Sequence, residues 1–392
     1  MSQELQYLLA VIGLFIVPRM LQRLRVPTAI TCLAIGAGLG MGMNAFHGDT
    51  TVPLLATLGI VALFLFAGLE VDIDELVHGA KVTLGHLVMQ GLLLGSATWV
   101  LGSLFHLDWR PSLLFALALF TPSAGFILDS LPGFGLTEQQ QYWVKTKAIA
   151  SELVALGALF IVVQSSSVTS LGLSSLALAA MVAALPVIFK VFASRMLPYA
   201  PKSEFAFVLI LALTCAYLTR HLGVYYLVGA FLVGVTAVRL RQRLPELVNE
   251  KMLTGIELFA SFFIPFYFFK AGLHLEKRYF VADAVLLGGA FAAIAIPLRV
   301  GVVAAHRRFA LDEPFRGGLS VGLSLVPTLV FTLVLADILH ERYAFPDHLY
   351  GSLIVFTLLN TILPGLILKA APPEFVAPEI PRSPTIPPPA HA

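Results

Sequence analysis

The chain has 392 residues and a formal net charge of +2 at pH 7; 58% of its residues are hydrophobic and 12% are charged. Soluble domains contain about 25% charged residues, so this composition excludes an ordinary soluble domain. The small net charge gives no basic field for nucleic acid. Cys32 and Cys215 both lie in apolar runs, which excludes a disulfide framework and a cysteine zinc site. We therefore expect an all-α polytopic membrane protein surrounded by lipid.

A helix needs about 20 mostly apolar residues to cross a bilayer. Runs of this kind predict thirteen membrane-spanning helices, at 5–22, 26–43, 52–71, 77–105, 111–130, 139–163, 172–193, 203–220, 223–238, 252–274, 281–305, 316–336 and 349–370. The helix over 139–163 has a start pattern, because Thr137 and Gln140 fit a capping box.

The connections between these runs are short, so residues 1–370 are predicted to form one transmembrane domain without a soluble insertion. The following segment, 371–392, contains eight prolines in 22 residues. This composition cannot form a packed core and predicts a disordered cytoplasmic tail. The tail is too short for a nucleotide-binding domain.

Lysine and arginine concentrate on the cytoplasmic side of membrane proteins. Of the 25 Lys and Arg residues, eighteen fall on or beside the alternate connections that share a side with the C-terminus, and five on the other side. This asymmetry predicts an external N-terminus and a cytoplasmic C-terminus, in a bacterial-type inner (plasma) membrane.

The six helices before the run at 172–193 and the six after it share local patterns. Residues 63–70 match 266–273, and two Pro-containing triplets, at 121–123 and 326–328, match at nearly the same offset. An odd single helix between two six-helix units inverts the second unit in the membrane. The pattern therefore predicts inverted repeats, which are typical of secondary transporters; the alternative is chance similarity between apolar helices.

Two predicted helices contain a proline at mid-span beside hydroxyl side chains. Pro122 lies between Thr121 and Ser123, and Pro327 precedes Thr328 and follows Ser324 by three residues. Proline frees an upstream carbonyl, and freed backbone at membrane depth must be buried in protein or line a cavity. We expect both helices to be interrupted there and to contribute oxygen ligands; the alternative is a simple kink.

Charges at bilayer depth cost several kcal/mol and are functional candidates. Glu152 lies about 14 residues into its helix, which places it about 21 Å deep, near the midplane. A carboxylate there could bind a proton or a cation, or form a structural ion pair with Arg299. Arg299 could instead extend to the interface or hold the broken helix ends. Lys270 is expected mainly to reach the outer interface, and Lys147 to be solvated or part of an access funnel.

Motifs for enzymatic chemistry find no support. Gly318, Ser320 and Gly322 fit a nucleophile-elbow pattern, but within a spanning helix close helix packing explains them better. The sequence has no zinc-protease HExxH, P-loop or dinucleotide fingerprint. We therefore predict that the protein is not an enzyme and needs no cofactor.

The motif residues together resemble the monovalent cation–proton antiporter superfamily. Residues 65–72, the triplet at Thr121 and the pair Ser151-Glu152 carry the likeness, which covers roughly 5–370. It is closest to the branch of bacterial sodium/proton and Kef-type potassium/proton exchangers.

The resemblance implies a homodimer in which a core slides against a fixed panel. The panel would be about 1–75 and 172–275, and the core about 76–165 and 281–370. Glu152 would inherit the acid that binds ion and proton in turn, Ser151 the position before it, and Arg299 a basic residue that compensates charge. The first acid of the family's pair is absent here, as is the gating domain of Kef-type proteins.

We therefore expect an antiporter that exchanges protons for Na⁺ or K⁺. The predicted shell is Glu152, Ser151, Thr121, Ser123, Ser324 and Thr328, with Arg299 and Lys270 compensating charge. Because Glu152 is the one deep carboxylate found in the sequence, exchange should be electroneutral. The alternatives are a cation channel and a carrier of a small organic solute on the same fold.

Overall fold

We describe a computed structural model of the chain over residues 3–21, 26–43, 46, 48–71, 80–165, 167–222, 226–312 and 314–368. The regular elements of these residues are helices, and no strand occurs among them. The predicted tail at 371–392 and part of the 65–72 motif lie outside the described residues.

The helices follow the predicted runs in chain order. They are α1 (Gln3–Leu21), α2 (Thr28–Met43), α3 (Thr51–Leu69), α5 (Ala80–Phe105), α6 (Trp109–Phe120), α7 (Ala124–Ser130), α8 (Glu138–Gln164), α9 (Val168–Val191), α10 (Glu204–His221), α11 (Tyr226–Leu240), α12 (Glu250–Leu273), α13 (Ala282–Leu311), α14 (Phe315–Ser324), α15 (Leu329–Tyr343) and α16 (Asp347–Ile367). Short helical turns are η2 (Leu131–Phe134), η3 (Phe192–Met196) and η4 (Lys277–Phe280).

Ten helical segments in the described residues are long and apolar enough to cross a membrane, with α6 and the start of α7 counted as one. The bent pair α14–α15 makes an eleventh. The two other predicted runs correspond to α2 and α11, which have only 16 and 15 residues. At 1.5 Å per residue such helices reach about 24 Å, less than the roughly 30 Å apolar core of a bilayer. All thirteen predicted runs are thus helical, but two are short.

The predicted start of α8 is also observed. The hydroxyl of Thr137 accepts from the backbone of Gln140, and the side chain of Gln140 accepts from the backbone of Thr137, which makes a capping box. Helix α6 begins at Trp109, two residues before the predicted run at 111–130, so Pro111 is its third residue.

Helices of the first repeat pack against helices of the second repeat. Helix α3 packs on α11 and α12, and α2 packs on α12. A Cβ atom at Gly68 of α3 would lie 2.2 Å from the carbonyl oxygen of Phe231 on α11, and one at Gly272 of α12 would lie 2.1 Å from that of Leu33 on α2. Gly68 and Gly272 are 204 residues apart, and Leu33 and Phe231 are 198 residues apart, which is close to the offset between the matching patterns of the two repeats. The reciprocal close contacts are those of a pseudo-two-fold axis relating inverted repeats.

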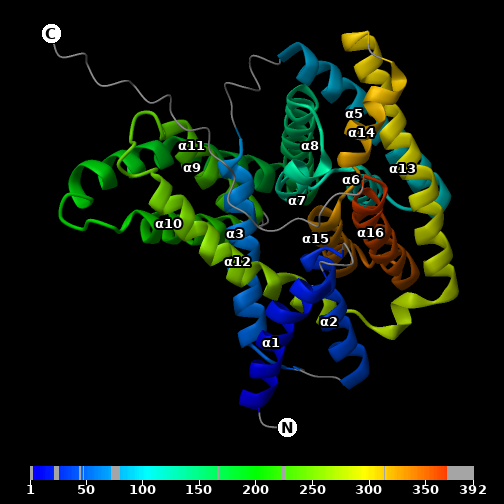
Figure 1. Cartoon of the computed structure of the whole chain (residues 1–392), viewed down its shortest axis with the longest axis horizontal. Helices are drawn as coiled ribbons and strands as arrows, with labels where there is room; N and C mark the ends of the chain where they lie inside the picture. Colours follow the sequence, from blue (N-terminus) through cyan, green and yellow to red (C-terminus); the bar gives the residue numbers. More distant parts are fainter. Residues whose placement is uncertain are drawn as a thin grey trace.

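Helices α5–α8 and α13–α16 pack mainly among themselves. Helix α13 packs on α14 and α16, α15 on α6 and α16, and α5 on α6 and α8. Figure 1 shows α5–α8 with α13–α16 on one side of the molecule and α3 with α9–α12 on the other.

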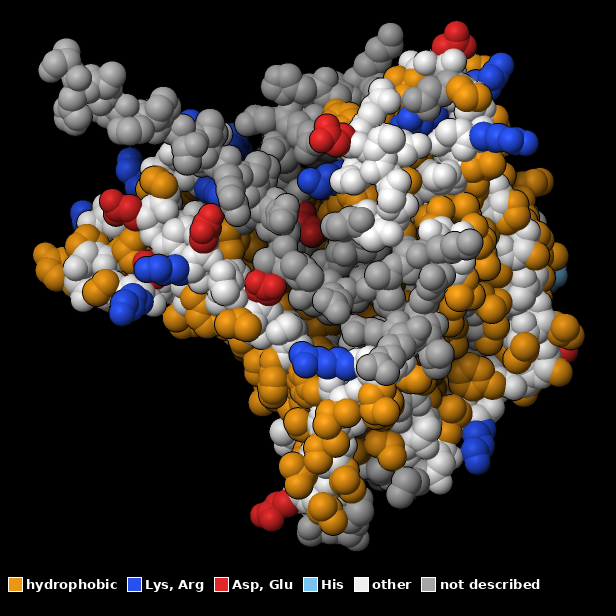
Figure 2. Space-filling view, in the orientation of Figure 1, with side chains coloured by type: hydrophobic (Ala, Val, Ile, Leu, Met, Phe, Trp, Pro, Cys, Tyr) orange, Lys and Arg blue, Asp and Glu red, His pale blue; other side chains and the backbone are white. Residues whose placement is uncertain are grey.

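Large apolar side chains cover much of the outer surface (Figure 2). Trp99, Leu92 and Leu286 are more than 70% exposed. A water-soluble surface would not carry so many such residues, whereas lipid chains solvate them. The helices therefore form a multi-pass membrane protein.

Candidate ion-binding site

Both proline-containing helices are interrupted where the sequence predicts. Helix α6 ends at Phe120 and α7 begins at Ala124, so Pro122 lies in a non-helical segment of three residues. Helix α14 ends at Ser324 and α15 begins at Leu329, with a 56° bend between them. These are breaks rather than simple kinks, since the chain is extended at Thr121 and Ser123.

The two breaks meet. The backbone N–H of Ser123 donates to the carbonyl oxygen of Pro327 at 2.9 Å, so the interrupted segments cross through a main-chain hydrogen bond. Beside this bond, the hydroxyl of Thr332 on α15 donates to the carbonyl oxygen of Ala118 on α6 at 2.7 Å. It also lies 2.6 Å from Thr328 Oγ1. Each broken helix therefore bonds a freed carbonyl of the other one, Ser123 that of Pro327 and Thr332 that of Ala118.

Glu152 is buried on α8 against this crossing. Its side chain is 4% exposed, and its Oε2 accepts from the backbone N–H of Ala124 at 3.1 Å. Ala124 is the first residue of α7, directly after the break. The buried carboxylate thus accepts from a main-chain donor that is free because α7 begins there.

Thr121 supplies an oxygen at the same break. Its Oγ1 is buried and has no hydrogen-bond partner among the described residues. Buried hydroxyls are normally paired, so an unpaired one beside a carboxylate-bearing crossing is suited to a ligand. Carboxylate, hydroxyl and carbonyl oxygens are the groups that bind a hard cation.

The other predicted shell residues differ in what they contact. The hydroxyl of Ser151 bonds to His86 Nε2 at 2.8 Å, and that of Ser324 donates to the Ser320 carbonyl of its own helix at 2.8 Å. Ser123 is buried at the break and contributes the main-chain bond to Pro327.

Thr328 is held by a side chain that the sequence analysis did not select. Asn360 on α16 accepts from the Thr328 backbone at 3.2 Å and donates to its hydroxyl at 2.8 Å. Thr357 lies 3.4 Å from the same hydroxyl. A lone asparagine inside an apolar helix, three residues after a threonine on the same face, was the available signal.

Arg299 does not form an ion pair with Glu152. No nitrogen of Arg299 lies within 4.0 Å of a carboxylate oxygen among the described residues. Instead, its guanidinium donates to the carbonyls of Val326 at 2.7 Å and Leu325 at 2.5 Å, and weakly to that of Leu119 at 3.5 Å. These carbonyls are released by the breaks, so Arg299 holds the broken helix ends, which was one of its three expected roles.

Lys270, expected mainly to reach the outer interface and otherwise to compensate charge at the Glu152 site, has a different acid as its neighbour. It acts electrostatically on Asp337, a half-buried carboxyl of α15 whose Oδ1 accepts from the hydroxyl of Tyr350 at 3.0 Å. Asp337 is not among the deep carboxylates predicted from the sequence, because it directly follows the predicted run at 316–336. Lys270 is thus a positive neighbour of Asp337, whereas no Lys or Arg nitrogen lies within 4.0 Å of the Glu152 carboxylate in the described chain.

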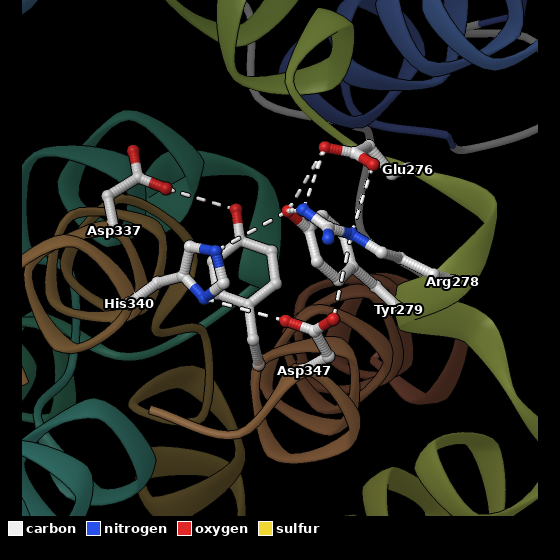
Figure 3. Close-up of polar contacts among 7 residues, drawn as sticks. Glu276, Arg278, Tyr279, Asp337, His340 and Asp347 are labelled. Carbon is white, nitrogen blue, oxygen red and sulfur yellow. Dashed lines mark hydrogen bonds and ion pairs between the residues drawn. The ribbon is translucent and has the colours of Figure 1, made fainter. Parts of the chain in front are cut away.

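Figure 3 shows the polar cluster that includes Asp337, Tyr279 and His340. The hydroxyl of Tyr279 lies 3.4 Å from His340, and Arg278 contacts Glu276 at 3.0 Å and Asp347 at 3.6 Å. These charges are mostly exposed, so solvent screens their attraction. The cluster joins η4 to α15 and α16 and is structural.

Lys147 is the clearest correction to the sequence analysis. It was expected to be solvated or to be part of an access funnel, and the first of these is wrong because Lys147 is only 1% exposed. Its Nζ lies 3.1 Å from His86 Nδ1 and 2.7 Å from His306 Nδ1. Neither histidine is near Lys147 in sequence, so the spacing gave no indication of the cluster. No group of three or more His, Cys, Asp or Glu residues in the described chain could hold a transition metal.

Two helices that are interrupted at mid-span, crossed through their main chains and packed against a buried carboxylate define a secondary transporter of the inverted-repeat class. Its sequence is more specific: residues 8–371 match the family described as "Sodium/hydrogen exchanger, transmembrane". The chain belongs to this family, whose members are transporters and not enzymes.

Individual relatives cover nearly the whole chain. It is 24% identical to a "Probable Na(+)/H(+) antiporter 3" of Methanocaldococcus jannaschii, over 91% of this chain and 93% of that protein. It is 22% identical to a "Na(+)/H(+) antiporter" of Enterococcus hirae, over 89% and 92%. Its fold is similar to a solved structure of the sodium proton antiporter MjNhaP1 from M. jannaschii, with a TM-score of 0.67 and 15% identity over 93% of this chain and 95% of that one.

Proposed function

We propose that this protein exchanges Na⁺ for H⁺, with Glu152 binding the two ions in turn. The family match and the two relatives named as Na⁺/H⁺ antiporters support the reaction. The observation that carries the site is the buried Glu152 carboxylate, bonded to the first main-chain N–H after the α6–α7 break. The unpaired hydroxyl of Thr121 at that break supports a cation ligand there.

The coupling follows from electrostatics. An empty, charged Glu152 is costly to move through a low-dielectric interior, whereas a carboxylate neutralised by H⁺ or Na⁺ is not. The loaded forms therefore cross and the empty form does not. Thr121, Thr328 and carbonyls at the crossing would replace the hydration shell of the cation, with Ser123, Ser151 and Ser324 around them.

The moving parts are inferred from the packing. We propose that the core, about 76–165 and 281–370, slides against the panel, about 1–75 and 172–275, within a homodimer. The division of helix contacts supports these two units. We also propose an inner (plasma) membrane location with an external N-terminus and a cytoplasmic C-terminus, on the basis of the Lys and Arg asymmetry.

One proton should exchange for one cation. Among the carboxylates of the described residues, Glu152 is the one bonded at the crossing, and Asp337 has Lys270 as a neighbour. With one site, either loaded form of Glu152 is neutral, so both half-cycles carry the same charge.

The direct test uses the purified chain in proteoliposomes that contain a pH-sensitive dye, with steps of Na⁺, K⁺ or Li⁺ outside. Proton movement driven by Na⁺ is expected. A response to K⁺ instead would change the ion but keep the mechanism. Cation uptake without proton movement would favour a channel, and no response to any of the three would favour a carrier of an organic solute.

A further inference from the structure

Four buried polar side chains form a row that starts beside the crossing. Ser151 and Lys147 lie on α8, His86 on α5 and His306 on α13, and each is at most 8% exposed. His86 and Lys147 are near the starts of their helices, and His306 is near the end of α13. The row therefore leads from the crossing toward the end of the bundle with Lys- and Arg-rich connections, which we assign to the cytoplasm.

The hydrogen bonds along this row are continuous. His86 Nε2 lies 2.8 Å from Ser151 Oγ, and its other ring nitrogen lies 3.1 Å from Lys147 Nζ. Lys147 Nζ lies 2.7 Å from His306 Nδ1. Imidazole, amine and hydroxyl groups can each accept a proton on one side and release one on the other. Each neighbouring pair is within proton-transfer distance.

At the end beside the crossing, the row borders a small cavity. His86, Lys147 and Ser151 line one part of the cavity, and Pro122 and Arg299 line another. Its volume is about 20 Å³, enough for one ordered water molecule. Pro122 is two residues before Ala124, which holds Glu152. The cavity thus brings the end of the row to the break where the carboxylate lies.

The charged groups that face the row are mostly cationic. Lys147 and Arg307 both lie over the ring of Trp143, at 5.2 and 4.7 Å from its centroid, and Arg307 acts electrostatically on Lys147. Arg299 faces the cavity from α13, and Glu152 follows Ser151 on α8. Like charges at this spacing repel, so two groups of the row are not protonated to the cationic form at the same time. The row is suited to passing a proton on.

We propose that His306, Lys147, His86 and Ser151 form the path by which protons travel between the Lys- and Arg-rich end and Glu152. This inference rests on the proposed antiport. A proton that reaches His306 at Nε2 releases the Nδ1 proton to Lys147, and Lys147 passes one to His86 Nδ1. His86 releases its Nε2 proton to Ser151, whose hydroxyl proton enters the cavity beside Pro122. Each group accepts one proton and gives one, so a single proton moves.

The test separates proton transfer from packing. Wild type, Lys147→Met and His86→Gln are placed in proteoliposomes, and two rates are measured: Na⁺-driven proton movement, and exchange of radioactive ²²Na⁺ for Na⁺ at equal concentrations. The second reaction needs no proton. We expect both variants to lose at least about tenfold in the first rate and to keep the second near the wild-type value. Lys145→Met is the matched control, because Lys145 is exposed on the same helix.

Glutamine at position 86 keeps hydrogen-bonding groups on both sides of the row but does not relay protons. Wild-type proton movement in both variants would overturn the path. An equal loss of both rates would also overturn it, since it would assign the row a structural role only. If wild type itself moves no protons in response to Na⁺, the proposed antiport fails and the path falls with it.

Discussion

Arg299→Met is expected to destabilise the crossing without changing the pH profile of transport. Arg299 donates to the carbonyls of Val326 and Leu325 at 2.7 and 2.5 Å, and methionine keeps the apolar stem but removes both donors. Hydrogen bonds from a charged group contribute about 1.5–3 kcal/mol each. Omitting the weak contact to Leu119, the loss of both bonds should lower the free energy of unfolding by about 3–6 kcal/mol.

The assay is denaturant unfolding in detergent, followed by proteoliposome transport across a pH series with the fraction that stays folded. Arg308→Met is the control, because Arg308 lies exposed on the same helix. Arg299→Lys should recover part of the stability, since an ammonium can reach one carbonyl but not both with fork geometry. Unchanged stability together with a displaced pH profile would refute this expectation and would indicate that Arg299 acts on the charge of Glu152.

Three further predictions concern the site and its charges. Thr121→Val removes an unpaired buried oxygen and should raise the Na⁺ concentration for half-maximal exchange by about tenfold, if one lost ligand is worth about 1.4 kcal/mol, with stability unchanged. Thr146→Val removes another unpaired buried hydroxyl and should leave that Na⁺ concentration unaltered. Equal effects of the two substitutions would argue against Thr121 as a ligand. Lys270→Met should reduce stability or activity, and Asp337→Asn in the same chain should restore part of the loss; additive effects in a double-mutant cycle would contradict their coupling. An imposed membrane potential should not change the Na⁺/H⁺ exchange rate, and clear acceleration by voltage would contradict a single titrating site.

Hydropathy and local chemistry predicted much of the fold. Apolar runs located the helices because every backbone group in lipid must be paired within a helix. Pro122 and Pro327 lie at both breaks, where the missing donor and the neighbouring hydroxyl side chains favour an interruption. A proline alone does not decide a break, since Pro265 and Pro297 lie inside continuous helices. The depth of Glu152 along α8 placed it near the crossing because helical rise is constant.

Partners that are distant in sequence could not be predicted in the same way. Asn360 meets Thr328, and His306 meets Lys147, only because separate helices pack together. From the sequence, Arg299 and Lys270 were both candidates to compensate the charge of Glu152, because the sequence gives the positions of charged residues but not the directions of their side chains. In the structure, Arg299 points to freed carbonyls, which no residue count along the chain reveals.

Glu152→Gln tests the central claim most directly. Glutamine preserves volume and can still accept from the backbone of Ala124, but it does not bind a proton or neutralise a cation. Glu138→Gln is the control, because Glu138 is exposed at the start of the same helix. In proteoliposomes, Glu152→Gln should elute and melt like wild type and show no Na⁺-driven proton movement, whereas Glu138→Gln should exchange normally. Proton movement at the wild-type rate in Glu152→Gln would contradict the account.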